Sequence, residues 1–163
     1  MITSIVEMPD QAKVWVYQAN RPFSDSERIL IEKNLEAFCG QWAAHGKQLT
    51  STYSIEKNQF IILAVDESGH QASGCSIDSS VHFIQQIEQA TGLSLLDKSQ
   101  VAFETEEGII IKPFNKLKEA VTTGEIKPDT IVFNNAIQNA AEWKSSWAIP
   151  ANQSWLKRFF SVN

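Results

Sequence analysis

The sequence predicts a single α+β domain over residues 1–163, with a ferredoxin-like βαββαβ core, an extra C-terminal hairpin, short helices and an aromatic-rich tail. Three observations support this fold class. A chain of 163 residues with 43% hydrophobic content suits one hydrophobic core. Apolar residues recur with the two-residue period of strands in some segments and with helical spacing in others. The segments follow the order strand, helix, strand, strand, helix, strand, which is that of the split βαβ fold.

The first strand and helix are marked by composition and by a capping motif. KVWVYQAN at 13–20 is rich in β-branched and aromatic residues, and Pro22 ends the strand because proline cannot continue a ladder. Ser24 and Glu27 have the spacing of a capping box, which predicts that a helix begins there. Apolar residues then recur at helical spacing, and we expect the helix to end at Gly46.

A strand hairpin and a second helix follow. Residues 47–57 alternate in polarity with a slip near their start, which is typical of a half-buried strand. After a polar turn at 57–59, Phe60–Val65 is apolar without alternation, as in a central strand that is covered on both faces. A glycine-containing loop leads into the next helix, and Gly92 is placed to end it.

The last third of the chain contains short elements and many aromatic residues. We expect strands at 101–107 and 109–114 around a turn at Gly108, a short helix that ends at Gly124, and an edge strand at 130–135. The tail contains three of the five tryptophans: Trp143, Trp147 and Trp155. Large aromatic side chains mostly serve cores, so we expect the tail to cover a face of the sheet; an exposed tail would be a protein interface.

Composition excludes several classes of protein. The formal charge is −5 and no long basic stretch is present, so we expect no nucleic-acid partner. The longest apolar run, Phe60–Val65, is far shorter than the about 20 residues of a membrane-spanning helix, so we expect no membrane span. The first residues lack the pattern of a secretory signal, and the two cysteines form no CxxC pair. We therefore expect a cytoplasmic protein.

Reactive side chains concentrate in the loop Gly69–Ser76. Its glycines have the spacing of the phosphate-binding motif GxxxxGK[ST], and an apolar strand and a helix flank it as that motif requires. Cys75 occupies the lysine position, however, and a thiol supplies no positive charge to the phosphates. Asp66 and Glu67 add repulsion. We expect an anion nest at most, formed at Gly74 and Ser76, and no ATP hydrolysis.

Three short segments carry a resemblance to a known family. They are WAAHG at 42–46, LAVDE at 63–67 and SGCSID at 73–78. In these segments the chain resembles a family of uncharacterised bacterial proteins often labelled "ABC transporter ATPase". The resemblance spans most of the chain. It implies no particular activity, because none is established for that family.

Cys75 is the residue on which a chemical function would depend. We place it at the start of a helix, where the positive end of the helix dipole favours a thiolate. His70 or His82 is then the candidate base, and Asp78 the orienting residue or helix cap. The alternative is that Cys75 is only a small packed residue. Cys39 lies beside Phe38 on an apolar helix, and we expect it to be buried and inert.

Asp66, His70, Cys75 and Asp78 are suitable metal ligands, but their spacing matches no standard site, so we expect neither a metal nor a cofactor. Two hypotheses follow from the sequence. The first is a small cytosolic binding or interaction module, whose partner is an unknown protein or a small anionic ligand. The second is a thiol-dependent enzyme or redox sensor that is centred on Cys75.

Overall fold

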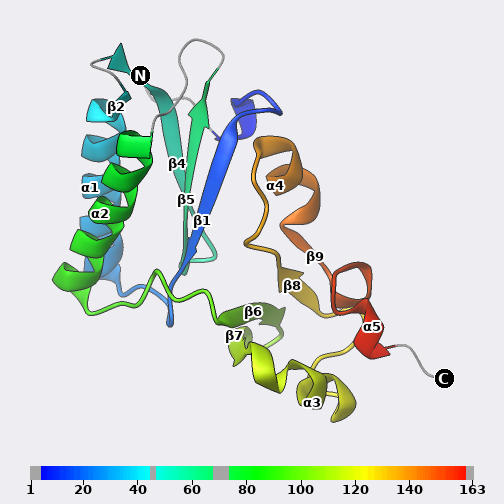
Figure 1. Ribbon diagram of the computed structural model, residues 1–163. Helices are drawn as coiled ribbons and strands as arrows, with labels where there is room; N and C mark the ends of the chain where they lie inside the picture. Colours follow the sequence, from blue (N-terminus) through cyan, green and yellow to red (C-terminus); the bar gives the residue numbers. More distant parts are fainter. Residues whose placement is uncertain (1–4, 45–46, 68–73, 161–163) are drawn as a thin grey trace. The chain divides into compact units, whose positions relative to one another are not determined.

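A computed structural model describes residues 5–44, 47–67 and 74–160 of the chain (Figure 1). It divides into two compact units. Unit 1 consists of Met1–Leu96 and Ala136–Lys144, and unit 2 of Asp97–Asn135 and Ser145–Asn163. Each unit contains an antiparallel sheet together with helices, so the predicted α+β class is confirmed.

The sheet of unit 1 has three strands in the order β1-β5-β4. These are β1 (Lys13–Gln18), β4 (Thr50–Glu56) and β5 (Phe60–Asp66). Both outer strands run antiparallel to β5, so they run parallel to each other on either side of it. This arrangement is the split βαβ unit that the order of elements predicts. The three-residue turn between β4 and β5 has Lys57 and Asn58 in the left-handed region, each with φ +53.

The central position of β5 follows from its composition. All residues from Phe60 to Val65 are fully buried. Ile61 and Leu63 face one core cluster, and Phe60 and Ile62 point to the opposite side of the sheet because strand side chains alternate. An uninterrupted apolar run is stable only where both faces of a strand are covered, as the sequence predicts for this segment.

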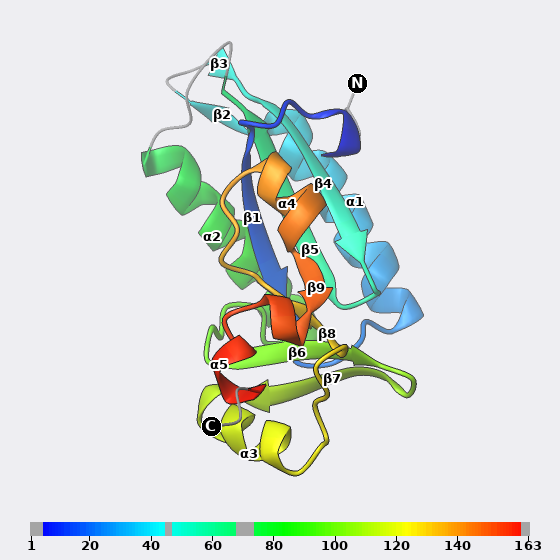
Figure 2. The same cartoon turned by 90° about the vertical axis from the view of Figure 1, so that its right-hand side faces the viewer.

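Two helices cover the same face of this sheet, as Figures 1 and 2 both show. They are α1 (Asp25–Gln41) and α2 (Gly74–Thr91). Ile31, Leu35 and Cys39 of α1 pack with Ile84 and Ile87 of α2 in one core cluster. Helix α2 ends at the predicted residue, where Gly92 has φ +77. A residue with a Cβ adopts that conformation only with strain.

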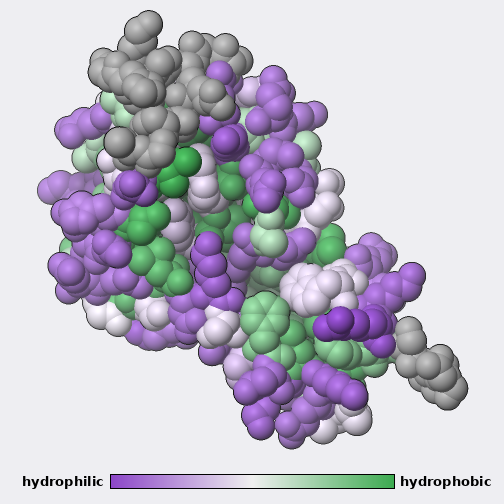
Figure 3. Space-filling view, in the orientation of Figure 1, coloured by the Kyte–Doolittle hydropathy of each residue, from purple (hydrophilic) through white to green (hydrophobic). Residues whose placement is uncertain are grey.

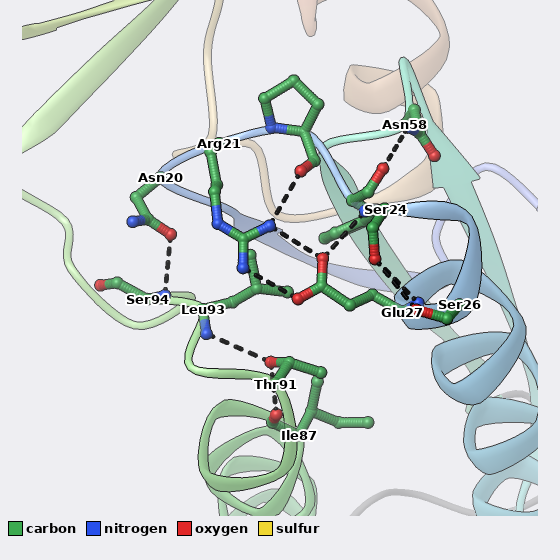
Figure 4. Close-up of polar contacts among 12 residues, drawn as sticks. Asn20, Arg21, Ser24, Ser26, Glu27, Asn58, Ile87, Thr91, Leu93 and Ser94 are labelled. Carbon is green, nitrogen blue, oxygen red and sulfur yellow. Dashed lines mark hydrogen bonds and ion pairs between the residues drawn. The ribbon is translucent and has the colours of Figure 1, made fainter.

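The capping box predicted at the start of α1 is present (Figure 4). The Glu27 amide donates to the Ser24 hydroxyl at 3.2 Å, and the Ser24 amide donates to the Glu27 carboxylate at 2.8 Å. Arg21 adds a contact that the motif does not predict, because its two terminal nitrogens each donate to a different Glu27 oxygen at 2.8 Å. The hydrogen bond from Arg21, followed by that from the Ser24 amide, lowers the pKa of Glu27 to about 2.

Replacing Glu27 by glutamine is expected to lower the free energy of unfolding by about 1 kcal/mol near neutral pH, since its partner Arg21 is exposed and solvent screens the pair. The pKa of Glu27 is lowered in the folded state. Its stabilising effect is therefore fully present above the ordinary pKa of about 4.5 and is lost as the pH falls toward about 2. Urea unfolding of both proteins from pH 7 to pH 2 measures this difference. A difference that stays constant down to pH 2 would contradict it.

Helix α1 ends earlier than the sequence predicts. The prediction placed its end at Gly46, but the helix ends at Gln41 with Trp42 as its C-cap. Two short strands, β2 (Ala43–Ala44) and β3 (Lys47–Gln48), pair there instead. The Leu49 amide also donates to the Trp42 carbonyl, at 2.8 Å. This hairpin takes up backbone groups that a longer helix would have used, so the prediction of the helix end is wrong.

The predicted ferredoxin-like topology is not confirmed. In that fold the strand after the second helix would lie beside β1, but β6 (Gln100–Thr105) belongs to the sheet of unit 2. The edge of β1 is instead contacted by a segment from later in the chain. The Val14 amide donates to the Gln138 carbonyl at 3.1 Å, and Lys13 forms a bridge with Asn139.

The sheet of unit 2 has four strands in the order β7-β6-β8-β9. Strand β7 (Gly108–Pro113) forms the predicted hairpin with β6, and Gly108 has φ +108 at the turn. The expectation of an edge strand at 130–135 is wrong. Strand β8 (Ile131–Phe133) lies inside the sheet, because β9 (Ala148–Pro150) of the tail pairs with its free side.

Short helices complete the two units. In the chain, η1 (Ile5–Glu7) precedes β1 of unit 1, and α4 (Ala140–Ser146) begins in the later segment of that unit. The short helices of unit 2 are η2 (Phe114–Lys116), α3 (Leu117–Thr122), η3 (Ala151–Gln153) and α5 (Lys157–Phe160). The core of unit 2 contains Phe103 of β6, Leu117 of α3 and Leu156 before α5. The tail thus folds back onto a core, as the sequence predicts.

Candidate functional site

The predicted chemical site lies between β5 and α2. Residues 68–73 of this loop, His70 among them, lie outside the described residues, as do the side chains of Cys75 and Ser76. The backbone of residues 74–76 forms the start of α2, which begins at Gly74. The predicted placement of Cys75 in the first turn of a helix is therefore confirmed. Its proposed contacts with a base or an anion stay predictions.

Asp78 and His82 are exposed residues of α2. Asp78 follows Cys75 by three residues, and such positions are neighbours on a helix surface. His82 follows Cys75 by two helical turns, which separates their backbones by roughly 10 Å along the axis. The His82 Nε2 atom lies 3.3 Å from the amide nitrogen of Gln86, on the next turn away from Cys75. Because the Cys75 side chain lies outside the described residues, the role of His82 as its base stays a prediction.

Two acidic residues lie at the end of β5, and one of them contacts a cation of β1. Asp66 is the last residue of β5 and is half-buried. A carboxylate oxygen of Glu67 lies 3.6 Å from the Lys13 ammonium. The lysine moderates the negative potential that the sequence places beside the loop, although the pair is partly exposed and therefore weak.

An aromatic group at this end of the sheet was not predicted as a neighbour of the site. The Trp15 and Trp42 ring centroids lie 5.9 Å apart, and the Phe38 centroid lies 5.0 Å from that of Trp42. Val65, next to Asp66, belongs to the same core cluster. The alternation of β1 and the helical spacing of α1 do indicate that each of these aromatic residues faces the core. The pairing of β1 with β5 and the packing of α1 against the sheet bring them together.

Cys39 is buried with 2% of its surface exposed, which confirms the prediction of a core cysteine. Its burial raises the pKa of the thiol to about 11, against a smaller lowering effect of Ser51. The Ser51 hydroxyl also donates to the Cys39 carbonyl at 3.2 Å and so ties the end of α1 to β4. A thiol in this environment is neither a nucleophile nor a metal ligand at neutral pH.

A second candidate surface lies in the tail of unit 2. We define the C-terminal aromatic surface by Trp155, Arg158, Phe159 and Phe160. Trp155 is 38% exposed, and the Arg158 guanidinium lies 4.9 Å from the centre of the Phe159 ring. Phe159 and Phe160 also pack against the core, so they are half-buried. In Figure 3, hydrophobic residues reach the surface in the region of unit 2.

The segment that carries this surface is held by local hydrogen bonds. The Ser154 hydroxyl donates to the Ala151 carbonyl at 2.7 Å and accepts from the Leu156 amide at 3.1 Å. The Phe159 amide donates to the Leu156 carbonyl at 2.8 Å. Leu156 is itself fully buried. The side chains of the C-terminal aromatic surface therefore stand on a fixed backbone.

The described residues contain no group of three or more His, Cys, Asp or Glu side chains that could hold a metal ion. None of their helices has the length and apolar character needed to cross a lipid bilayer. Comparison with known proteins found no matching family model, no matching curated protein and no matching solved structure.

Proposed function

We propose that this protein is a small cytoplasmic interaction module that binds a partner protein through the C-terminal aromatic surface. The observation that carries this proposal is Trp155, a tryptophan left 38% exposed beside an arginine and two phenylalanines. Trp and Arg are the residue types most enriched among those that dominate binding energy at protein interfaces. A single exposed apolar residue is ordinary, but these four lie within six consecutive positions.

The fixed backbone of this segment supports the proposal. Ordering a loop on binding costs conformational entropy, and Leu156 and Ser154 have already ordered this one. Lys157 and Arg158 place two cations beside the aromatic rings. The partner that fits such a surface presents an apolar pocket or patch bordered by carboxylates.

Replacing Trp155 by alanine is expected to weaken partner binding at least about tenfold, as truncation of a central interface tryptophan does. The full chain, its Trp155→Ala variant and its Phe114→Ala variant would each be purified from the cells that naturally make the protein, and bound proteins quantified by mass spectrometry. Phe114 is a matched control, because it is an aromatic residue of unit 2 that is 54% exposed and lies outside the proposed surface.

A partner that is retained by the Phe114→Ala variant and lost by the Trp155→Ala variant would support the proposal. Recovery of no specific protein, or equal recovery by all three proteins, would overturn it. Equal melting temperatures of the three proteins would show that the loss does not come from unfolding.

A thiol-dependent enzyme or redox sensor is the second candidate function. It is favoured by the position of Cys75 in the first turn of the 18-residue helix α2, where unpaired amides and the helix dipole stabilise a thiolate. Alkylation of Cys75 well below pH 8 would support it, and slow alkylation would remove its basis. The same turn is where a small anion would bind, and a rise in melting temperature with phosphate would support that binding.

A further inference from the structure

The outer edge of β7 offers backbone groups to another strand. Strand β7 is the last strand of its sheet and pairs only with β6 among the described strands. Its register with β6 contains no bulge, and the Phe114 amide extends the ladder by donating to the Ser99 carbonyl at 3.1 Å. Backbone groups alternate sides along an antiparallel strand. The backbone N–H and C=O groups of Ile110 therefore point toward β6, as the amide of Phe114 does. The backbone groups of Ile109 and Ile111 point outward, away from β6.

The outer edge of β7 lacks most of the features that prevent an edge strand from pairing with a strand of another chain. Ile109, Ile110 and Ile111 are three consecutive β-branched apolar residues, all of them half-buried, and no charge lies among them. Natural edge strands usually carry charges, bulges or prolines that prevent pairing with another chain. In β7, Lys112 and Pro113 hinder pairing with another strand only at the C-terminal end.

The edge also fits a second copy of itself. We propose that two copies of this chain associate by antiparallel pairing of their β7 strands around a twofold axis at Ile110. In this register Ile109 of each copy lies opposite Ile111 of the other. The outward-facing backbone groups of Ile109 and Ile111 in one copy then lie opposite those of Ile111 and Ile109 in the other. The two copies exchange about four backbone hydrogen bonds.

Charge favours β7 over β4, an end strand of the sheet of unit 1. Unit 2 contains seven Lys or Arg and seven Asp or Glu, so the formal charge of −5 falls entirely on unit 1. Strand β4 is an edge of unit 1, and burial followed by the carboxylates of Glu36 and Glu32 raises the pKa of its Tyr53. Pairing of two β4 strands would therefore bring two acidic helices together, at a cost in repulsion.

At β7 the proposed register brings no like charges directly opposite each other. Lys112 of one copy lies opposite Gly108 of the other, and its charge is already balanced by Glu125 of its own copy, 2.6 Å away. The pairing is short, and interfaces smaller than about 1,200 Å² are typically weak, so we expect a Kd above about 1 µM. This dimer does not depend on the proposed function, because it leaves the C-terminal aromatic surface outside the paired strands.

Sedimentation of the full chain from about 1 µM to about 1 mM tests the association. The mass of the wild-type protein is expected to rise from 18.3 kDa toward twice that value. The Ile111→Lys variant is expected to weaken the dimer at least about tenfold, because it places a charge opposite an isoleucine. Ile29→Lys, the same change at a 68% exposed site on α1, should leave it unchanged. A wild-type protein that stays monomeric, or a dimer that Ile111→Lys does not weaken, would overturn the proposal.

Cross-linking tests the register without an added charge. In a Cys75→Ser background, Ile110→Cys is expected to form a disulfide dimer on mild oxidation, since facing residues at this kind of position lie about 4.5 Å apart at Cα. Ile109→Cys is the matched control. Its counterpart in the second copy lies about 8 Å away, beyond the reach of a disulfide. Equal cross-linking of the two variants, or none by Ile110→Cys, would overturn the register.

Discussion

Replacing Phe103 by alanine is expected to lower the free energy of unfolding by about 3–5 kcal/mol, the largest effect we predict for a single residue. Phe103 lies in β6, is fully buried and is opposite Val132 of β8. Leu117 and Leu156 belong to the same core cluster. Truncation would remove the apolar area of a ring and leave a cavity that several elements border. Urea unfolding followed by circular dichroism measures the loss.

Phe114→Ala is the matched control for this prediction. Phe114 undergoes the same chemical change but is 54% exposed, so its loss should be below about 0.5 kcal/mol. Equal losses in the two variants would mean that Phe103 is not part of a packed core. The same unfolding curves test the predicted single domain, since one cooperative unit gives coincident transitions by circular dichroism and by tryptophan fluorescence.

Alkylation of Cys39 in the folded protein is expected to be at least about 100-fold slower than in the protein unfolded by urea. Burial raises the pKa of this thiol from 9.0 to about 11, which lowers the thiolate fraction about 100-fold at neutral pH. Exclusion of the reagent from a site with 2% exposure slows the reaction further. A Cys75→Ser variant isolates Cys39, and iodoacetamide labelling followed by mass spectrometry measures the rate.

The complementary Cys39→Ala variant isolates Cys75 and allows the two thiols to be compared at each pH. If the start of α2 stabilises a thiolate, Cys75 will react well below pH 8 while Cys39 stays protected. Rapid labelling of Cys39 in the folded protein would show that α1 and β4 do not enclose it. That result would contradict the packing described for unit 1.

Local features of the structure were predictable because the residues that determine them are close in the sequence. Ser24 and Glu27 form the predicted capping box within one helical turn. Gly92 and Gly108 have the positive φ angles expected at a helix end and at a hairpin turn. The burial of Phe60–Val65 follows equally from an apolar run that is stable only in the interior. Each of these is decided by the energetics of a few neighbouring residues.

The candidate site was predictable only in part. The start of α2 at Gly74 agrees with the sequence, because the loop before it contains turn residues and the segment after it has helical periodicity. The Arg21 contact with Glu27 and the aromatic group at Trp15 were missed, since each joins residues whose approach depends on the path of the chain between them.

By itself the sequence determined the α+β class, the burial of Phe60–Val65 and the burial of Cys39, because periodicity and hydrophobicity act on each segment separately. Only the tertiary structure decided that β6 joins a second sheet, that β9 turns β8 from an edge into an interior strand, and that β7 has a partner on one side only among the described strands. Strand pairing joins backbone groups that every residue carries. The sequence pattern therefore shows that a segment is a strand, and the packing of the whole chain selects its neighbours.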